Sequence, residues 1–218
     1  MITIGSVSML IAAYLLGSIP TAVWIGRLFY GVDVREYGSG NAGATNTFRV
    51  LGKKAGIPVM LIDILKGFTA TYLAHFIGMS ITGGPHSNLI NYELALGIAA
   101  VMGHLFPVFA GFRGGKGIAT LFGMVLEVNI SAALLCIIIF IIVLLVTRYV
   151  SLSSITGGFT YLVGVSLIYN KNTNNMVVIF GMCICLLILV THQKNIERLL
   201  KGTESKVNLF KKKTVDQA

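Results

Sequence analysis

The sequence has little charge and no long polar segment. Only 11% of its 218 residues are charged, whereas 55% are hydrophobic; soluble domains carry roughly 25% charged residues. The longest polar segments, residues 30–54 and 193–218, are too short for a separate soluble domain. This composition excludes a water-soluble fold and predicts one integral-membrane domain over residues 1–218, with a basic tail over 193–218.

Several chemical signals are also missing. The three cysteines, Cys136, Cys183 and Cys185, lie inside apolar runs and fit neither a metal spacing nor a disulfide framework. The sequence contains no Ser-His-Asp order, no redox cofactor motif and no H-x4-D motif. We therefore expect neither a metal nor a cofactor. No Lys or Arg precedes Arg27, so Met1–Phe29 lacks the charged start of a cleaved signal and is expected to be a retained first helix.

The positive charges indicate a topology. Net charge is +9, but Lys and Arg are confined to a few loops and the tail, which argues against nucleic acid and for the positive-inside rule. With the N-terminus outside, internal segments 27–54, 112–116, 148–152 and 193–218 hold 15 of the 17 basic residues. Lys171 is then external and Lys66 lies within a span. The expected fold is an all-α polytopic bundle of seven transmembrane helices with a cytoplasmic C-terminus.

One region leaves the helix count open. Only 31 residues separate Lys116 from Arg148, while two full crossings need about 40. A single crossing would put Arg148 and the basic tail outside. Residues 117–147 are therefore expected to go out and return, either as two short helices turning near residues 127–129 or as a re-entrant hairpin. The second case gives five helices plus the hairpin.

A glycine-rich loop follows the first apolar run. Glycines allow backbone N–H groups to converge on an anion, the hydroxyl and amide side chains offer neutral hydrogen bonds, and an arginine offers a charged fork for phosphate. A flexible connecting loop would explain the glycines but not the amides and the arginine. The candidate binding residues are Gly38, Ser39, Gly40, Asn41, Gly43, Thr45, Asn46 and Arg49.

A second glycine-rich turn, within residues 103–120, presents Lys116 at the start of a helix, where unpaired amides and the helix dipole favour an anion. Two cations in an internal turn are also expected from topology alone, but that does not explain the surrounding glycines. The Walker A spacing fails and no strand precedes the turn, so a nucleotide fold is not expected. The candidates here are Gly114, Gly115, Lys116 and Gly117.

Two weaker signals lie at other internal ends of helices. His192, Asn195 and Arg198 recur every three residues, so one helical face can present them together; an amphipathic interfacial tail is the alternative. Ser154 adds a hydroxyl, although serine at a helix start is an ordinary cap. Asp63 and Lys66 lie three apart within a span, where charges mark either a site or a mutual ion pair.

From the residues alone, the chain is expected to bind phosphate-bearing ligands from the cytoplasm, beside membrane lipid. A transporter of an organic phosphate or small anion shares these features. Transporters often show repeated halves with a site at the midplane, whereas here no internal repeat is evident and the polar groups lie on one side. An enzyme is therefore favoured over a transporter, and a structural scaffold explains none of the glycine clusters.

Three long motifs carry a resemblance along essentially the whole chain. GSGNAGATNTFR, GHLFPVFAGFRGGKGIAT and HQKNIERLLKGTESK, supported by DILKG at 63–67 and RYVSLSSI at 148–155, resemble the bacterial acyl-phosphate:glycerol-3-phosphate acyltransferases, the PlsY family. Ala42 stands where a valine is frequent and Arg113 where a lysine is frequent. Neither departure removes a group that the chemistry is expected to need.

The resemblance implies transfer of a fatty acyl group from acyl phosphate to the 1-hydroxyl of sn-glycerol 3-phosphate, giving lysophosphatidate and inorganic phosphate. This is the first step of bacterial phospholipid synthesis, in the cytoplasmic membrane with the site facing the cytoplasm. Glycerol 3-phosphate and acyl phosphate are the implied partners, and a monomer is compatible with the sequence. The expected catalytic residues are Ser39, Arg49, Lys116, His192 and Asn195.

The expected substrate-binding residues are the remaining glycine-loop and turn positions together with Ser154. The proton of the attacking hydroxyl goes either to His192 as a base or to a substrate phosphate oxygen. The second route is favoured, because only Glu197 and Glu204 are placed to tune a histidine.

Overall fold

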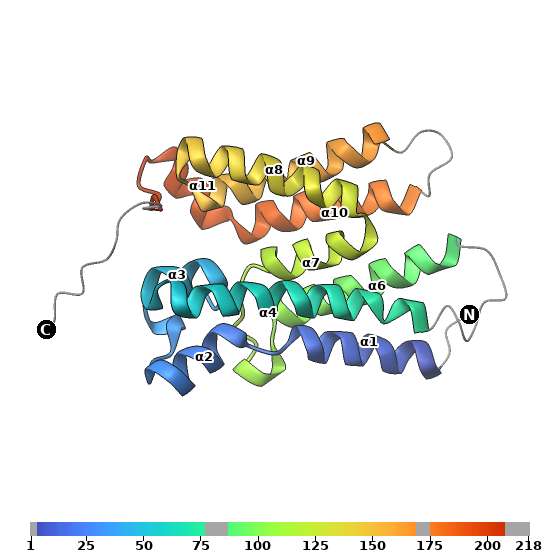
Figure 1. Cartoon of the computed structure of the whole chain (residues 1–218), viewed down its shortest axis with the longest axis horizontal. Helices are drawn as coiled ribbons and strands as arrows, with labels where there is room; N and C mark the ends of the chain where they lie inside the picture. The colour runs from blue at the N-terminus through green and yellow to red at the C-terminus, as the bar shows by residue number, and fades with distance from the viewer. Residues whose placement is uncertain (1–3, 77–86, 169–174, 208–218) are drawn as a thin grey trace, which may run out of the picture.

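The computed structural model describes residues 4–76, 87–168 and 175–207 (Figure 1). In these ranges the secondary structure is helical and contains no strand, which confirms the all-α expectation. Lys171 and the end of the basic tail lie outside the described residues. The α-helices are α1 (Ile4–Gly17), α2 (Thr21–Tyr30), α3 (Ala44–Leu51), α4 (Lys53–Tyr72), α6 (Ser87–Leu105), α7 (Ile118–Val128), α8 (Ile130–Thr147), α9 (Val150–Ile168), α10 (Asn175–Thr191) and α11 (Gln193–Leu200). Two 3₁₀ turns are η1 (Val34–Glu36) and η2 (Val108–Ala110).

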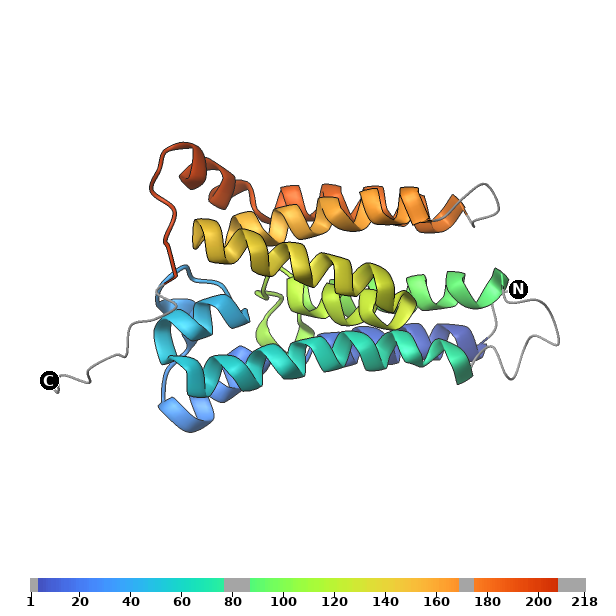
Figure 2. The ribbon, with the colours of Figure 1, turned by 45° about the horizontal axis from the view of Figure 1, so that its top comes forward.

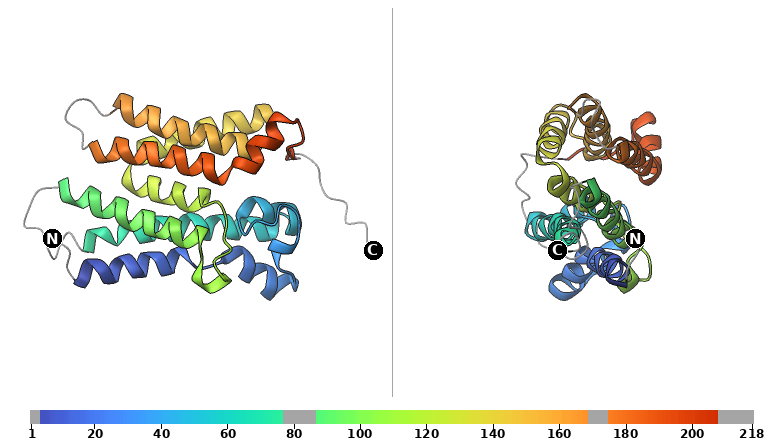
Figure 3. Two further views of the ribbon diagram at one scale, coloured as in Figure 1. Left: turned by 180° about the vertical axis from the view of Figure 1, so that it is seen from behind. Right: turned by 90° about the vertical axis from the view of Figure 1, so that its right-hand side faces the viewer.

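The long helices form two groups that lie side by side (Figures 2 and 3). α1, α4, α6 and α7 pack together in one group, and α8, α9 and α10 form the other. The buried side chain of Met124 on α7 belongs to the same apolar cluster as Tyr161 on α9 and Phe180 on α10. α7 therefore joins the two groups through the core.

Close helix contacts in the first group depend on glycine. A Cβ at Gly123 of α7 would collide with the carbonyl of Ile64 on α4, and a Cβ at Gly67 of α4 would collide with the carbonyl of Thr120 on α7. Small residues allow backbones in a membrane to approach closely, where apolar burial gives no net drive for association. These glycines fix α4 against α7, and α7 begins directly after the Lys116 turn.

Helix length and composition bear on the predicted number of membrane crossings. Among the described residues, four helical segments are long and apolar enough to cross a membrane, and up to six are if each of two bent pairs counts as one span. α7 has 11 residues, which is about 17 Å of helix, against a hydrocarbon core of roughly 30 Å. The predicted seven spans are therefore not confirmed, because α7 is too short to cross alone.

The predicted reversal between Lys116 and Arg148 is present. α7 ends at Val128, and Asn129 caps α8 by accepting a hydrogen bond from the N–H of Ala132 at 2.9 Å. Residues 117–147 thus form a short helix, α7, and a longer helix, α8, that turn at Asn129. The turn lies where the first of the two alternatives placed it.

The polar elements gather at one end of the bundle. α2, α3 and α11 lie there, whereas α1 and α6 begin at the opposite end (Figure 1). Two bends produce this arrangement, of 41° between α1 and α2 and of 65° between α10 and α11. The short helix α11 thereby turns off the axis of α10 at the end of the bundle where α2 and α3 also lie (Figures 1 and 2).

Candidate functional site

The first glycine loop is shaped by Asn46. This side chain is 2% exposed; its Oδ1 accepts from the N–H of Ser39 at 2.9 Å, and its Nδ2 donates to the carbonyls of Val34 and Tyr37 at 2.8 and 3.1 Å. Gly38 and the following Gly40 have φ values of 63° and 71°, a region that side chains rarely adopt. Asn46 therefore holds the turn that glycine makes possible.

The other predicted residues of this loop are accessible. Ser39, Thr45 and Arg49 are exposed, and Asn41 is half-buried. Within the described ranges, Arg49 takes part in no ion pair. An exposed arginine without a carboxylate partner, one helical turn beyond the loop, is available to an anionic ligand.

Arg35 fastens this loop to the second glycine turn. Its guanidinium donates to the carbonyls of Ala110 and Arg113 at 2.7 and 3.3 Å and to the Asp33 carboxylate at 2.7 Å. Its hydrogen bonds hold the pKa of Asp33 well below the usual range. The sequence analysis counted Arg35 only among the basic residues that indicate topology. The signal that could have revealed its structural role is the Asp-x-Arg spacing of Asp33 and Arg35.

The second glycine turn is packed against the end of α6. Gly115 donates its N–H to the carbonyl of His104, and Gly114 donates to Leu105, both at 3.2 Å. A Cβ on Gly115 would collide with the His104 ring. These two N–H groups are therefore already engaged, unlike the unpaired amides expected from the sequence. Both glycines allow close packing, and Gly117, with φ 77°, begins α7.

Lys116 is joined to α11 through a chain of hydrogen bonds. Its ammonium donates to Oδ1 of Asn195, whose Nδ2 donates to Glu204 at 2.6 Å. Glu204 also accepts from Arg198 at 2.6 Å and from Ser151 at 2.8 Å. The carboxylate thus organises groups from α9, α11 and the residues after α11, none of which lies near Lys116 in sequence.

The surroundings of Lys116 are positively charged. Burial lowers its pKa to about 8, and the charges of Arg198 and Arg49 act in the same direction, while Glu204 opposes them. Three cations from α3, the turn before α7 and α11 are therefore close enough to interact. Since Glu204 already holds Arg198, Asn195 and Ser151, the cluster favours an added anion.

His192 lies beside this cluster, directly after α10. It is 2% exposed, and its Nδ1 lies 3.0 Å from the carbonyl of Ile188, which assigns the proton to Nδ1. Burial and the charge of Lys116 lower its pKa to about 4. The ring is therefore neutral near pH 7, with Nε2 as its acceptor.

Ser154 donates its hydroxyl hydrogen bond within its own helix. Its buried hydroxyl donates to the carbonyl of Val150 one turn earlier in α9, at 2.9 Å. In the same helix, Ser151 is the hydroxyl that reaches Glu204. The sequence shows a run of serines, and only the fold distinguishes Ser151, which bonds to Glu204, from Ser154, which bonds within its helix.

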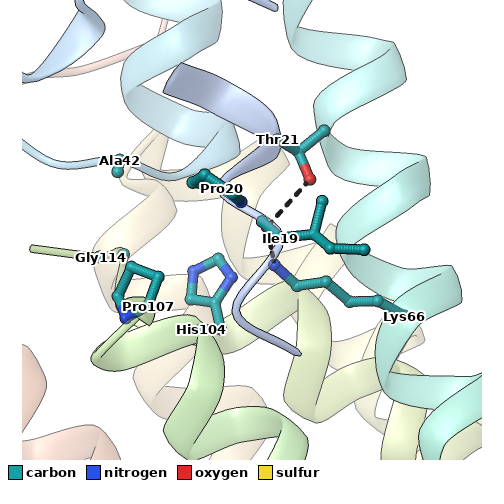
Figure 4. Close-up of a pocket in the computed structure, with 9 residues that line it drawn as sticks. Ile19, Pro20, Thr21, Ala42, Lys66, His104, Pro107 and Gly114 are labelled. Atoms are coloured by element: carbon teal, nitrogen blue, oxygen red, sulfur yellow. Dashed lines mark hydrogen bonds between the residues drawn. The ribbon is translucent and has the colours of Figure 1, made fainter. Parts of the chain in front are cut away.

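Asp63 and Lys66 form a buried structural pair. Their charged atoms are 2.9 Å apart, Lys66 also donates to the carbonyl of Ile19 at 3.0 Å, and Thr21 donates to Asp63 at 3.2 Å. The pair thus stabilises the break between α1 and α2. Lys66 lines a small cavity together with His104, Pro107 and Gly114 (Figure 4).

Four of the predicted catalytic residues therefore lie near one another, namely Arg49, Lys116, His192 and Asn195. The structure adds Arg198, Glu204 and Ser151 to this cluster. The predicted residues Asn46, Gly114 and Gly115 instead shape the loops through their own hydrogen bonds. These features define an integral-membrane helical protein with a cluster of cations at one end of its bundle.

Comparisons with known proteins agree with this class. The model of the glycerol-3-phosphate acyltransferase family matches residues 7–202. Glycerol-3-phosphate acyltransferase of Enterococcus faecalis (strain ATCC 700802 / V583) is 42% identical, over 97% of this chain and 99% of the relative. Glycerol-3-phosphate acyltransferase 3 of Bacillus anthracis is 43% identical, over 93% and 95%. The chain belongs to the glycerol-3-phosphate acyltransferase family, a family of enzymes.

Two solved structures are similar over nearly the whole chain. Both are crystal structures of PlsY (YgiH), an integral membrane glycerol 3-phosphate acyltransferase. The glycerol 3-phosphate form is 39% identical with a TM-score of 0.82, covering 95% of this chain and all of the other. The lysophosphatidic acid form is 38% identical with a TM-score of 0.79, covering 94% and 96%.

Proposed function

We propose that this chain transfers a fatty acyl group from acyl phosphate to the 1-hydroxyl of sn-glycerol 3-phosphate. The products are lysophosphatidate and inorganic phosphate. The observation that carries the proposal is the Lys116 cluster, in which cations from three elements meet at one end of an apolar bundle. Family membership supports the reaction class, and the resemblance of three motifs to the acyl-phosphate-dependent enzymes supports the donor.

In this proposal the two phosphates bind to neighbouring cationic elements. Arg49 and the first glycine loop hold one phosphate, and Lys116 holds the other. Ser39, Asn41 and Thr45 orient substrate oxygens from the loop, and Asn195 fixes the direction of the Lys116 ammonium. Binding both substrates beside one cation cluster holds them in a reactive orientation and makes the bimolecular step effectively unimolecular.

The chemistry uses a donor that is already activated. The glycerol 1-hydroxyl oxygen forms a bond to the acyl carbonyl carbon, and the bond from that carbon to the phosphate oxygen breaks. The leaving phosphate keeps the electron pair of that bond, and cations stabilise the charge that develops on it. The hydroxyl proton passes to a phosphate oxygen, because His192, with its pKa lowered to about 4, is a weak base.

The proposed site faces the cytoplasm of a bacterial inner membrane, with the N-terminus outside. Basic residues gather at the end of the bundle that holds α3, the Lys116 turn and α11, as the positive-inside rule expects of a cytoplasmic side. The acyl chain lies between apolar helices that open to the adjacent leaflet. A monomer supplies every group that this mechanism uses.

The test uses purified protein in lipid mesophase, with acyl phosphate or acyl-CoA offered in parallel. The proposal expects phosphate release that requires both glycerol 3-phosphate and acyl phosphate, with lysophosphatidate identified by mass spectrometry. Turnover with acyl-CoA alone would contradict acyl phosphate as the donor, but the protein would still be an acyltransferase. Silence with both donors, together with glycerol 3-phosphate flux into liposomes, would contradict the enzyme and indicate a transporter.

A further inference from the structure

A second polar cluster lies at the opposite end of the bundle from Lys116. It contains His75, just beyond α4, Glu93 on α6 and Glu127 at the end of α7. Along α4, His75 is about 33 Å from Lys53, where the cation end begins. None of these three residues belongs to the motifs or the site described above.

The three side chains offer a set of metal ligands. Nε2 of His75 lies 2.9 Å from Oε1 of Glu127 and 3.6 Å from Oε1 of Glu93, and the three ligand atoms all lie within 4.8 Å of one another. Zn²⁺ binds nitrogen and carboxylate oxygen at about 2.0–2.2 Å, which puts neighbouring ligand atoms roughly 3.3 Å apart. The observed spacing therefore needs only small side-chain rotations.

Burial provides an independent reason for a ligand. The Glu127 side chain is 5% exposed, and within the described ranges its Oε2 is buried without a hydrogen-bond partner. A buried carboxylate oxygen without a partner is costly. A cation bound by the cluster would supply that partner and compensate two carboxylates held close together.

The cluster is accessible on one side. The Glu93 side chain is 10% exposed, whereas that of His75 is 39% exposed. His75 lies one residue before the end of the candidate span Lys53–Phe76, so an ion can reach it from the membrane surface and be held by the two buried carboxylates beside it. An imidazole in the set favours zinc or a neighbouring transition metal over Mg²⁺ and Ca²⁺, which prefer oxygen ligands alone.

We infer that His75, Glu93 and Glu127 form a binding site for a divalent transition-metal ion, represented by Zn²⁺. The site ties the end of α7 to α4 and α6, the same helices whose other ends hold the Lys116 turn. It stabilises the packing of these three helices and takes no part in acyl transfer.

The experiment titrates Zn²⁺ alone into chelator-treated, full-length protein in detergent, with binding followed by calorimetry. The wild type is expected to bind one ion per chain. His75→Gln and Glu127→Gln each remove a ligand, so each is expected to weaken binding at least about 100-fold, the upper range for changes just outside a metal's ligands. Glu197→Gln, an exposed carboxylate at the cation end, is the matched control and is expected to bind like the wild type.

A second measurement avoids dependence on variants. Histidines of the wild type are acylated with diethyl pyrocarbonate and read by mass spectrometry, with and without Zn²⁺. The inference expects Zn²⁺ to protect His75. Wild-type protein that binds no Zn²⁺, or that binds it without protecting His75, would overturn the inference. Unchanged binding in both ligand variants, if they elute as folded protein, would overturn it equally.

Discussion

The two ends of this helix bundle carry opposite kinds of polar group. At one end, Arg198 pairs with Glu204, and the charges of Arg49 and Arg198 both act on Lys116. At the other end, two carboxylates, Glu93 and Glu127, surround one imidazole, that of His75. The first set is suited to anions and the second to cations. Since α4, α6 and α7 run between both ends, one packed group of helices supports two electrostatic environments.

The ends also differ in how they are built. The cation end depends on loops whose glycines and side chains are close in sequence, such as Gly38 with Asn46. The carboxylate end takes His75 from just beyond α4, Glu93 from α6 and Glu127 from α7. Loops commonly carry function on a rigid scaffold, and here the tight α4–α7 contact at Gly67 and Gly123 provides that scaffold.

The largest expected effect is the loss of a cation from the first end. Lys116→Ala and Arg49→Ala are each expected to lower turnover on the order of 10²–10³-fold, as does removal of one preorganised donor in a water-excluded site. Phosphate release in the two-substrate assay measures this. Lys54→Ala, an exposed lysine at the start of α4, is the control and should retain its rate. Full activity of either site variant would contradict the cation cluster.

Glu204→Gln tests whether the carboxylate bonded to Arg198 and Asn195 positions the cations. The change removes the charge from hydrogen bonds of 2.6–2.8 Å to Asn195, Arg198 and Ser151. Losing one charge-assisted bond costs about 1.5 kcal/mol, so kcat is expected to fall about tenfold. Steady-state kinetics should show this loss in kcat, with protein that elutes as folded. Turnover equal to the wild type would show that Asn195 holds Lys116 without help.

The pH dependence of the reaction tests the charge of Lys116 without truncating its side chain. Lys116, with its pKa lowered to about 8, is charged below pH 8 and loses its proton above it. Phosphate binding is therefore expected to weaken above pH 8, and kcat/KM at pH 9 should be about tenfold lower than the plateau. Lys116→Arg keeps its charge and should remove this decline. A decline that persists unchanged in Lys116→Arg would assign it to another group.

His192→Ala is expected to have a smaller effect. If a substrate phosphate takes the proton, the variant should keep turnover within about tenfold of the wild type, since a general base contributes 10²–10⁴-fold. Single-turnover measurement with saturating substrates separates this step from binding. A loss of about 10³-fold with folded protein would make His192 the base.

Removal of metal ions is expected to have the smallest effect. The cation end uses arginine and lysine to hold phosphate, so chelation should leave the rate of phosphate release unchanged. The inferred metal site is at the other end of α4 and does not contact the substrates. A rate that falls on chelation and returns with Zn²⁺ would contradict the separation of the two ends.

Much of the cation end was predictable because its signals are local. Apolar runs and clustered cations predicted an all-helical membrane protein, and glycines next to Arg49 and Lys116 marked the loops. The spacing of His192, Asn195 and Arg198 predicted a shared face, and the fold brings Asn195 to Lys116. Assignment of these residues to substrate contacts stays a prediction.

Other features depend on distances that the sequence does not contain. Glu204 meets Ser151 across 53 residues, and His75 meets Glu127 across 52. Neither pair leaves a periodic pattern. The engaged N–H groups of Gly114 and Gly115 likewise depend on how the turn packs against α6. The span count was uncertain for another reason: the turn near residues 127–129 was predicted, but hydropathy does not decide whether a segment as short as α7 crosses the membrane.

The most direct test of the cation end is chemical labelling of Lys116. An amine-reactive acylating reagent at pH 8 should label this lysine readily, because its lowered pKa leaves a large neutral fraction. Labelling of wild-type protein is read by mass spectrometry with glycerol 3-phosphate, with a non-hydrolysable acyl phosphonate, and with neither; Lys54 serves as the internal reference. We expect one of the two ligands to protect Lys116 while Lys54 is labelled equally throughout. Equal labelling of Lys116 under all three conditions, with active enzyme, would contradict the account.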